Sequence, residues 1–199
     1  GNGGWKTFQY DSAKTGYAPD IEPPQSGVAG KWTFESGGVP VITSVGGDGT
    51  VYVFTEDGTL HAIAPDSGEQ NWTFDTTHDT ATALVIVNET VYLAVEEKIY
   101  ALASADGTEL WSQSFPGQSL SGLDAGADGL VVVQTVESAQ AFGADSGEKQ
   151  WEIELDRGYG VLLVTDETVY VQTDRLLALS TDGEQLWKSS PISATVFGV

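Results

Sequence analysis

The sequence predicts an all-β protein made of repeated four-stranded antiparallel sheets, the blades of a β-propeller. Three recurring features lead to this prediction. Trp residues recur at positions 32, 72, 111, 151 and 187. Strand-like runs such as VYVFT (51–55), VYLAV (91–95) and LVVVQT (130–135) recur in phase with them. Short turns rich in Asp, Asn and Gly separate these runs and favour hairpins. A period of about 40 residues with four strands per unit is typical of propeller blades.

The elements follow in order from this period. We expect a leader over residues 1–38, in which GKWTF (30–34) forms one outer strand that closes a blade. The propeller itself is expected over residues 39–190. Its four blades are predicted at 39–75, 76–114, 118–154 and 156–189. The tail, residues 191–199, is predicted to be the first strand of an unfinished blade. Nothing in the units has the spacing of an amphipathic helix.

Each unit ends in nearly the same phrase, for example AIAPDSGEQNW (62–72) and AFGADSGEKQW (141–151). A large indole on the outermost strand can fasten neighbouring blades, and a small Ala leaves room for the ring. The Gly accepts the positive φ that the turn requires. The predicted docking residues are Trp72, Trp111, Trp151 and Trp187, with Ala62, Ala101, Ala141 and Ala178 and with Gly68, Gly107, Gly147 and Gly183. An aromatic row that stacks sugars or bases is the alternative.

These residues carry a family resemblance. Ala-x-x-x-x-Ser-Gly-x-x-x-Trp resembles the tryptophan-docking motif of the pyrroloquinoline quinone (PQQ) repeat propellers, and residues 48–72 resemble one whole repeat. The resemblance implies an arc of a seven- or eight-bladed propeller, similar to the lipoprotein propellers of outer-membrane assembly. The family usually has Asp at the third motif position, where this chain has other residues. We expect the missing turn bonds to come from Asp66, Asp106, Asp145 and Asp182.

Four blades fall short of the number that this resemblance implies. Three explanations are open. The first, which we favour, is that the chain is an N-terminal piece of a longer protein. The others are that two copies form an eight-bladed ring, or that leader and tail close a small ring. Open arcs leave strand edges bare, and bare edges recruit partners. We therefore expect self-association in the first two cases.

The resemblance also raises the question of enzymatic activity. PQQ dehydrogenases hold their quinone on the propeller axis with calcium, a catalytic Asp and two adjacent Cys, and this chain has no Cys. His61 and His78 each lack the further ligands that a metal site needs. We expect no enzymatic activity, no cofactor and no metal. The predicted function is a non-catalytic protein-interaction or scaffold module of unknown partner, and the alternative is part of a PQQ-dependent quinoprotein dehydrogenase.

The charge of the chain excludes some partners. It has 8 Lys and Arg against 29 Asp and Glu, a formal charge of −21. Nucleic acids and anionic membrane surfaces require a cationic patch and are not expected to bind. An acidic surface is tolerated in concentrated salt, where charges are screened, so we expect a salt-adapted protein of a halophilic archaeon. An acidic mesophilic protein is the alternative.

Two surface features complete the predictions. Arg157 and Tyr159 form a candidate partner-contact loop, because Arg and Tyr are favoured anchors. Alternatively, Arg157 neutralises the acidic residues beside it. Asn88, in the triplet Asn-Glu-Thr of a predicted turn, is a candidate glycosylation site. With the GNGG start, which suits residues after a lipid-modified Cys, these features favour an extracytoplasmic protein attached to the cell surface. A cytoplasmic protein is the alternative.

Overall fold

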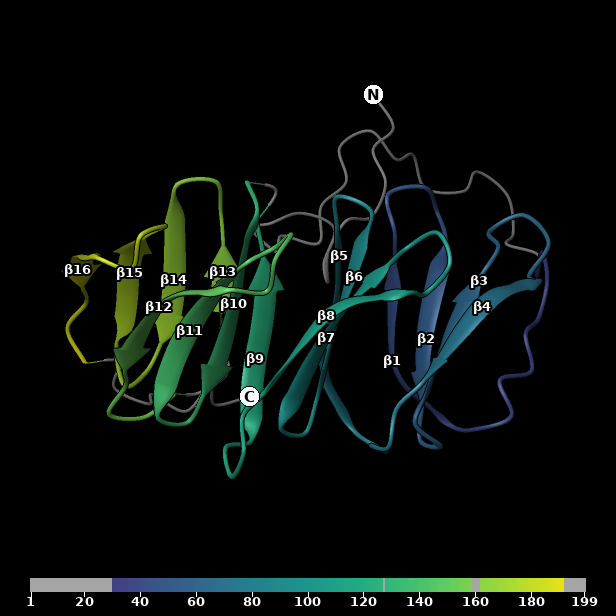
Figure 1. Ribbon diagram of the computed structural model, residues 1–199, viewed down its shortest axis with the longest axis horizontal. Helices are drawn as coiled ribbons and strands as arrows, with labels where there is room; N and C mark the ends of the chain where they lie inside the picture. Colours follow the sequence, from purple (N-terminus) through teal and green to yellow (C-terminus); the bar gives the residue numbers. More distant parts are fainter. Residues whose placement is uncertain (1–29, 127, 159–161, 192–199) are drawn as a thin grey trace, which may run out of the picture. The chain divides into compact units, whose positions relative to one another are not determined.

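The chain was studied as a computed structural model, and the structure describes residues 30–126, 128–158 and 162–191. These ranges contain four antiparallel sheets of four strands each, and no helix among them is long and apolar enough to span a membrane. The chain divides into two compact units, the first ending at Ser114 and the second beginning at Phe115. Figure 1 labels the strands of these sheets and colours them along the sequence. The predicted fold class, all-β with four-stranded antiparallel blades, is confirmed.

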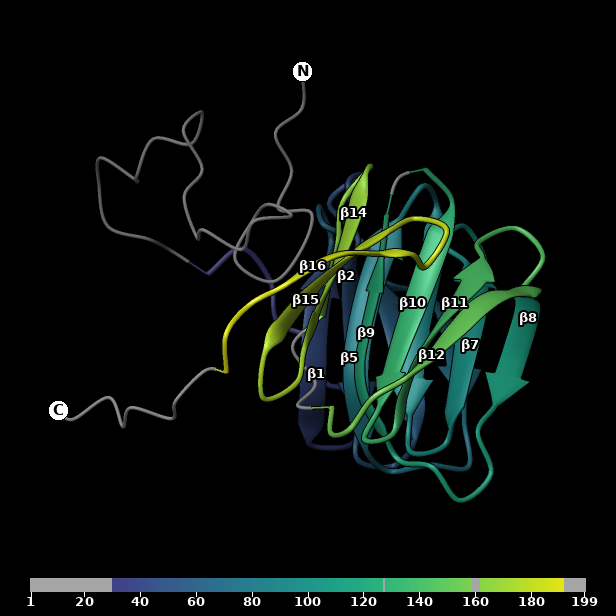
Figure 2. The ribbon, with the colours of Figure 1, turned by 90° about the vertical axis from the view of Figure 1, so that its left-hand side faces the viewer.

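In each sheet, every strand pairs with the strand that follows it in the sequence. The first unit has two sheets, made of β1 (Pro40–Val45), β2 (Val51–Thr55), β3 (Thr59–Ile63) and β4 (Gln70–Asp75), and of β5 (Ala81–Val87), β6 (Thr90–Val95), β7 (Lys98–Ala103) and β8 (Glu109–Ser114). The second unit has β9 (Leu120–Ala125), β10 (Leu130–Thr135), β11 (Ser138–Gly143) and β12 (Lys149–Glu154), and then β13 (Leu162–Val164), β14 (Thr168–Gln172), β15 (Leu176–Ser180) and β16 (Gln185–Lys188). Figure 2 shows β9, β10 and β11 side by side.

The hairpin turns form where the sequence predicts them. Asn88 and Glu89 link β5 to β6 with φ of 48° and 63°, which is the backbone of a two-residue type I′ turn. Gly58 links β2 to β3 with φ of 85°, a conformation that a side chain adopts only with strain. These turns reverse the chain within two or three residues, so consecutive strands become neighbours in one sheet.

The core of each unit lies between its two sheets. In the first unit, Tyr52, Phe54 and Leu60 pack with Leu93 and Val95 of the second sheet in one buried cluster. The second unit repeats this arrangement with its own cluster of Val, Leu and Ala side chains. The middle strands are buried on both faces, which explains why β6 and β10 are continuous apolar runs rather than alternating ones. Outer strands such as β4 alternate, because one face is exposed to solvent.

The leader differs from the prediction. Residues 30–36 belong to no strand, although an outer strand was expected at GKWTF. The segment still alternates as a strand would: Lys31, Thr33 and Glu35 are exposed, whereas Trp32 and Phe34 are half-buried. Trp32 and Phe34 contact the first sheet, but within the described ranges the segment joins none of the four sheets. The expectations for residues 1–29 and for the tail 192–199 lie outside the described residues.

Candidate functional site

Trp72 fastens the first sheet to the second. Its indole Nε1 donates a hydrogen bond of 2.9 Å to the carbonyl of Ser104, in the turn between β7 and β8. The ring lies on Gly107 of the same turn, where an added Cβ would be 2.6 Å from Trp72 Cε3. Ala62 lies directly opposite Trp72 in the β3–β4 pair and is fully buried. The indole therefore covers backbone that only Gly leaves open, and we call such a turn between third and fourth strands a docking turn.

The same contact recurs at two other positions. Trp151 donates a bond of 2.7 Å to the carbonyl of Thr181, and its ring lies over Gly183. Trp32, in the leader, donates a bond of 2.9 Å to the carbonyl of Pro65 and lies over Gly68. Trp32 was not among the predicted docking residues. Its distance of 40 residues from Trp72 is the signal that could have identified it.

Two further Trp residues of the described ranges, Trp111 and Trp187, can be compared with these three. Trp111 is buried, pairs with Ala101 and has its ring 6.0 Å from that of Tyr92. Gly147 has the positive φ of a docking turn, 66°. Trp187 pairs with Ala178, and its ring is 6.1 Å from that of Tyr170, but the residue is 46% exposed. Within the described ranges, no hydrogen bond of the Trp187 indole is found.

The prediction that Asp side chains supply the hydrogen bonds of the docking turns is only partly right. Asp106 accepts a bond from the amide of Thr108, as predicted. In the other docking turns the acceptor is a serine hydroxyl: Ser67 for Glu69, Ser146 for Glu148, and Ser180 for Glu184. Ser and Asp both form such local side-chain to backbone bonds, so the sequence could not distinguish them. Asp66 instead forms an ion pair of 2.8 Å with Lys31 of the leader.

An acidic recess of about 340 Å³ opens at one end of the first unit. Three connections line it: the β2–β3 turn, the β4–β5 loop and the β6–β7 turn. The lining residues are Glu56, Asp57, Thr76, Thr77, His78, Asp79 and Glu96. The recess was not predicted, because nothing in a sequence shows which turns of neighbouring sheets meet.

Hydrogen bonds fix the shape of the recess. The amide of Thr76 donates to the carbonyl of Gly58 at 2.8 Å, which ties the β4–β5 loop to the β2–β3 turn. His78 Nδ1 lies 3.0 Å from Glu96 Oε2. The hydroxyl of Thr55 donates to Asp57 at 2.5 Å, and this bond lowers the pKa of the Asp57 carboxyl below its usual value. Asp57 is therefore ionised at neutral pH and adds its charge to the recess.

The other predicted residues are not among those that line the recess. Arg157 is exposed in the loop after β12, and Tyr159 lies outside the described residues. Asn88 is exposed in its turn, as glycosylation would require. His61 is a buried strand residue whose Nδ1 lies 2.9 Å from Gln70 Oε1. In the part of the chain that is described, no group of three His, Cys, Asp or Glu side chains has the arrangement of a metal site.

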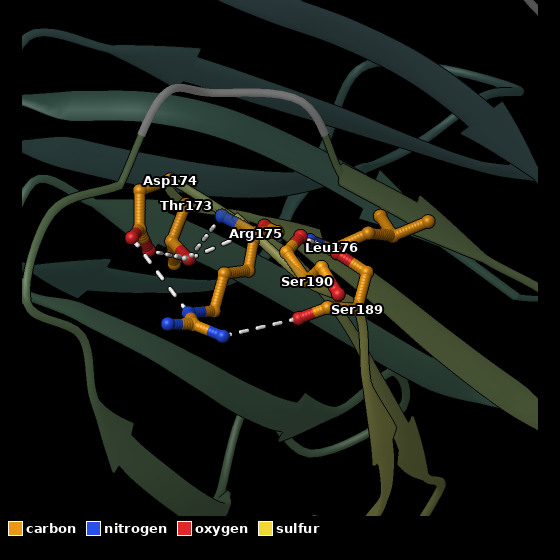
Figure 3. Close-up of polar contacts among 6 residues, drawn as sticks. All are labelled: Thr173, Asp174, Arg175, Leu176, Ser189 and Ser190. Atoms are coloured by element: carbon orange, nitrogen blue, oxygen red, sulfur yellow. Dashed lines mark hydrogen bonds and ion pairs between the residues drawn. The ribbon is translucent and has the colours of Figure 1, made fainter. Parts of the chain in front are cut away.

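Arg175 ties together the end of the last sheet (Figure 3). Its Nη1 donates to the carbonyl of Ser189 at 3.3 Å, and its Nε lies 3.7 Å from Asp174. The amide of Leu176 donates to the hydroxyl of Ser189 at 3.0 Å. These bonds link the β14–β15 turn to the residues just after β16. The role of Arg175 in this turn was not predicted from the sequence.

Sequence comparison identifies relatives of two kinds, a dehydrogenase and a hydrolase. A quinohemoprotein alcohol dehydrogenase of Comamonas testosteroni is 29% identical over 178 residues, and the match covers 74% of this chain. A tetrathionate hydrolase of Acidithiobacillus ferrooxidans is 25% identical over 169 residues and covers 70%. The matches span only 25% and 33% of the lengths of these relatives.

Structural comparison gives the same fold. The quinohemoprotein alcohol dehydrogenase of Comamonas testosteroni superimposes with a TM-score of 0.71 at 20% identity, over 94% of this chain and 41% of that one. BamB of Moraxella catarrhalis superimposes with a TM-score of 0.57 at 20% identity, over 76% and 52%. The family model described as outer membrane protein assembly factor BamB matches residues 4–114 and 95–196. The chain therefore belongs to the BamB family of PQQ-like repeat β-propellers.

Proposed function

We propose that the chain is a non-catalytic protein-interaction module whose acidic recess receives a cationic segment of a partner protein. The observation that carries the proposal is the convergence of Glu56, Asp57, Asp79 and Glu96 on one recess from three connections. Carboxylates accept charge-assisted hydrogen bonds from Lys and Arg, and these bonds are stronger than those between neutral groups. A partner of opposite charge is also attracted over a distance, which raises its association rate.

Two further facts support this proposal. The family model is described as an assembly factor, and the two sequence relatives, a dehydrogenase and a hydrolase, differ in activity, so the shared fold does not imply one reaction. The chain also carries 29 acidic residues against 8 basic ones, so a cationic partner fits it better than an anionic one. Export to an extracytoplasmic, saline environment is part of the same proposal, because the acidic surface suits such a medium.

A double variant of the recess tests the proposal. Glu56→Gln with Glu96→Gln removes two of its charges and leaves Asp57, which holds its own turn, in place. We expect an oligolysine peptide to bind the double variant at least about fivefold more weakly than the wild type by calorimetry, since each lost charge contact is worth about 0.5–1 kcal/mol. The control, Glu109→Gln with Glu148→Gln, removes equal charge from exposed positions outside the recess. Equal weakening in both variants would mean that the peptide responds to net charge alone, against the proposal.

One observation favours a second function, part of a PQQ-dependent dehydrogenase. The dehydrogenase of Comamonas testosteroni is 29% identical to this chain over most of its length. Titration with pyrroloquinoline quinone and Ca²⁺, followed by Trp fluorescence, separates the two functions. Saturable quenching that requires Ca²⁺ would favour the dehydrogenase, whereas the interaction module predicts only linear, unspecific quenching.

A further inference from the structure

His78 is the residue through which the charge of the acidic recess can change near neutral pH. Its Nδ1 lies 3.0 Å from Glu96 Oε2, so it joins the β4–β5 loop to the β6–β7 turn. The side chain of His78 is 21% exposed, and that of Glu96 is 47% exposed. Solvent therefore reaches the imidazole, and a proton can bind to it or leave it without any opening of the fold.

Every charged residue that lines the recess with His78 is acidic. These residues are Glu56, Asp57, Asp79 and Glu96. Two further charged residues follow Glu96 in the chain, but neither lines the recess: Glu97 is exposed, and the Nζ of Lys98 lies 4.2 Å from the centre of the Tyr100 ring. A proton on His78 is thus the one positive charge that the described lining of the recess can supply.

Backbone contacts hold His78 in place. The amide of His78 donates to the hydroxyl oxygen of Thr76 at 3.2 Å, and the amide of Thr76 donates to the carbonyl of Gly58 at 2.8 Å. The β2–β3 turn lies close against the loop, because a Cβ added to Gly58 would be 2.7 Å from the carbonyl oxygen of His78. A proton on the imidazole therefore changes the charge of the recess at a fixed position, beside the carboxylates.

We propose that His78 makes the recess release its cationic partner when the medium becomes mildly acidic. This inference rests on the proposed function of the recess. Histidine ordinarily changes its charge between pH 5 and pH 8, a range in which carboxyl groups in general stay ionised. Protonated His78 pairs with Glu96 and occupies a carboxylate that a Lys or Arg of the partner would use. At higher pH the imidazole is neutral, and Glu96 keeps its full charge for the partner.

The coupling between proton and partner acts in both directions. If a proton on His78 weakens the binding of the partner by some factor, the bound partner weakens the binding of the proton by the same factor. The proposal therefore predicts two measurable effects of one size: a change of affinity with pH, and a shift in the pH at which His78 titrates when the partner is bound.

Calorimetry with an oligolysine peptide tests the first effect, at about pH 5.5 and pH 8 and at equal ionic strength. We expect the wild type to bind the peptide at least about threefold more weakly at pH 5.5, the size of one exposed charge contact. The control is His78→Asn, which keeps an N–H donor near Glu96 but does not titrate. Its affinity should be nearly equal at both pH values, and circular dichroism checks that it folds.

Nuclear magnetic resonance of the wild type tests the second effect without any variant. The chain has only two histidines, and His61 is buried, so their ring C–H signals can be followed separately. Saturating oligolysine should lower the midpoint of the His78 titration by at least about 0.5 pH unit, which is the threefold change of affinity.

The outcomes separate this inference from the function on which it rests. Equal affinity of the wild type at both pH values, the same pH dependence in His78→Asn, or an unchanged titration of His78 with bound peptide would each overturn the inference and leave the function standing. A peptide that binds at neither pH would contradict the proposed function, and the inference would fall with it.

Discussion

At the scale of single residues, Trp72 and Trp187 occupy equivalent positions in their sheets, but only Trp72 is covered by a following sheet. Trp72→Ala should lower the free energy of unfolding by about 3–5 kcal/mol, because it leaves a cavity and removes the bond to Ser104. Trp187→Ala is the matched control and should cost less than about 1 kcal/mol, measured by urea denaturation at a concentration where the protein is monomeric. Equal losses would contradict the role of Trp72 as a fastener.

Gly107 tests the backbone side of the same contact. A side chain at this position meets both a positive φ of 75° and the ring of Trp72, whereas Gly117 has φ of 74° and nothing within 4 Å of an added Cβ. Gly117→Ala should therefore cost only the backbone strain, about 1–2 kcal/mol. Gly107→Ala should cost more, because the indole must also move. Urea denaturation of the two variants measures the difference, and an equal cost would show that the indole does not lie on Gly107.

Because of Tyr52, the free energy of unfolding should depend on pH in the alkaline range. Burial, and then the charge of Asp48, raise the pKa of Tyr52 to about 12. The unfolded chain loses the proton near pH 10, before the folded chain does, so stability should fall between about pH 10 and pH 12 by up to about 1.4 kcal/mol per pH unit. Tyr52→Phe should remove this part of the dependence. Unfolding free energies of both proteins at several pH values check it, and parallel curves would contradict it.

At the scale of elements, the β5–β6 hairpin has a turn whose second residue is strained. Glu89 has φ of 63°, which Gly adopts more easily. Glu89→Gly should therefore raise the stability by a few tenths to about 1 kcal/mol, since Asn-Gly is the preferred type I′ pair. The control Glu109→Gly, in strand β8, should lower it, because Gly weakens a strand. A stabilisation in both variants, or in neither, would contradict this description of the turn.

The strands and turns could be predicted from the sequence because each rests on local chemistry. Alternating or continuous apolar runs predict strands, and Asn88-Glu89 or Asp57-Gly58 predicts the turn between them. The leader strand at Trp32 could not be predicted correctly, because a strand also needs a neighbour, and the neighbour is not a local property. For the same reason the sequence did not show that His78 and Glu96 meet, although they lie only 18 residues apart.

At the scale of the whole molecule, the net negative charge has the main influence on how stability responds to salt. The formal charge of −21 repels itself in dilute buffer, and salt screens this repulsion. The midpoint of thermal unfolding should therefore rise steadily between about 0.1 M and 2 M NaCl. Potassium chloride at equal concentration should act alike, since the effect is one of screening. A midpoint that stays constant or falls with salt would contradict the prediction of a salt-adapted surface.

The repeat made the fold class predictable for the described residues, because similar four-stranded sheets recur and the two sheets of each compact unit bury side chains against each other. The four Trp residues of the motif pair with an Ala on the neighbouring strand, as the nearly constant spacing within the motif suggests: ten residues for Trp72, Trp111 and Trp151, and nine for Trp187. The occupant of each docking turn did not follow from it. Trp32 takes a turn that its sequence period alone suggests, and the exposure of Trp187 depends on what stands next to the last sheet.

The central claim is that the indoles of Trp72 and Trp151 bond to the backbone of the following sheet. Hydrogen exchange of the indole N–H groups, followed by nuclear magnetic resonance and assigned with Trp→Phe variants, tests it most directly. The N–H groups of Trp72 and Trp151 should exchange at least a hundredfold more slowly than that of Trp187, because they donate to Ser104 and Thr181. Exchange of Trp72 and Trp151 as fast as that of Trp187 would contradict the claim.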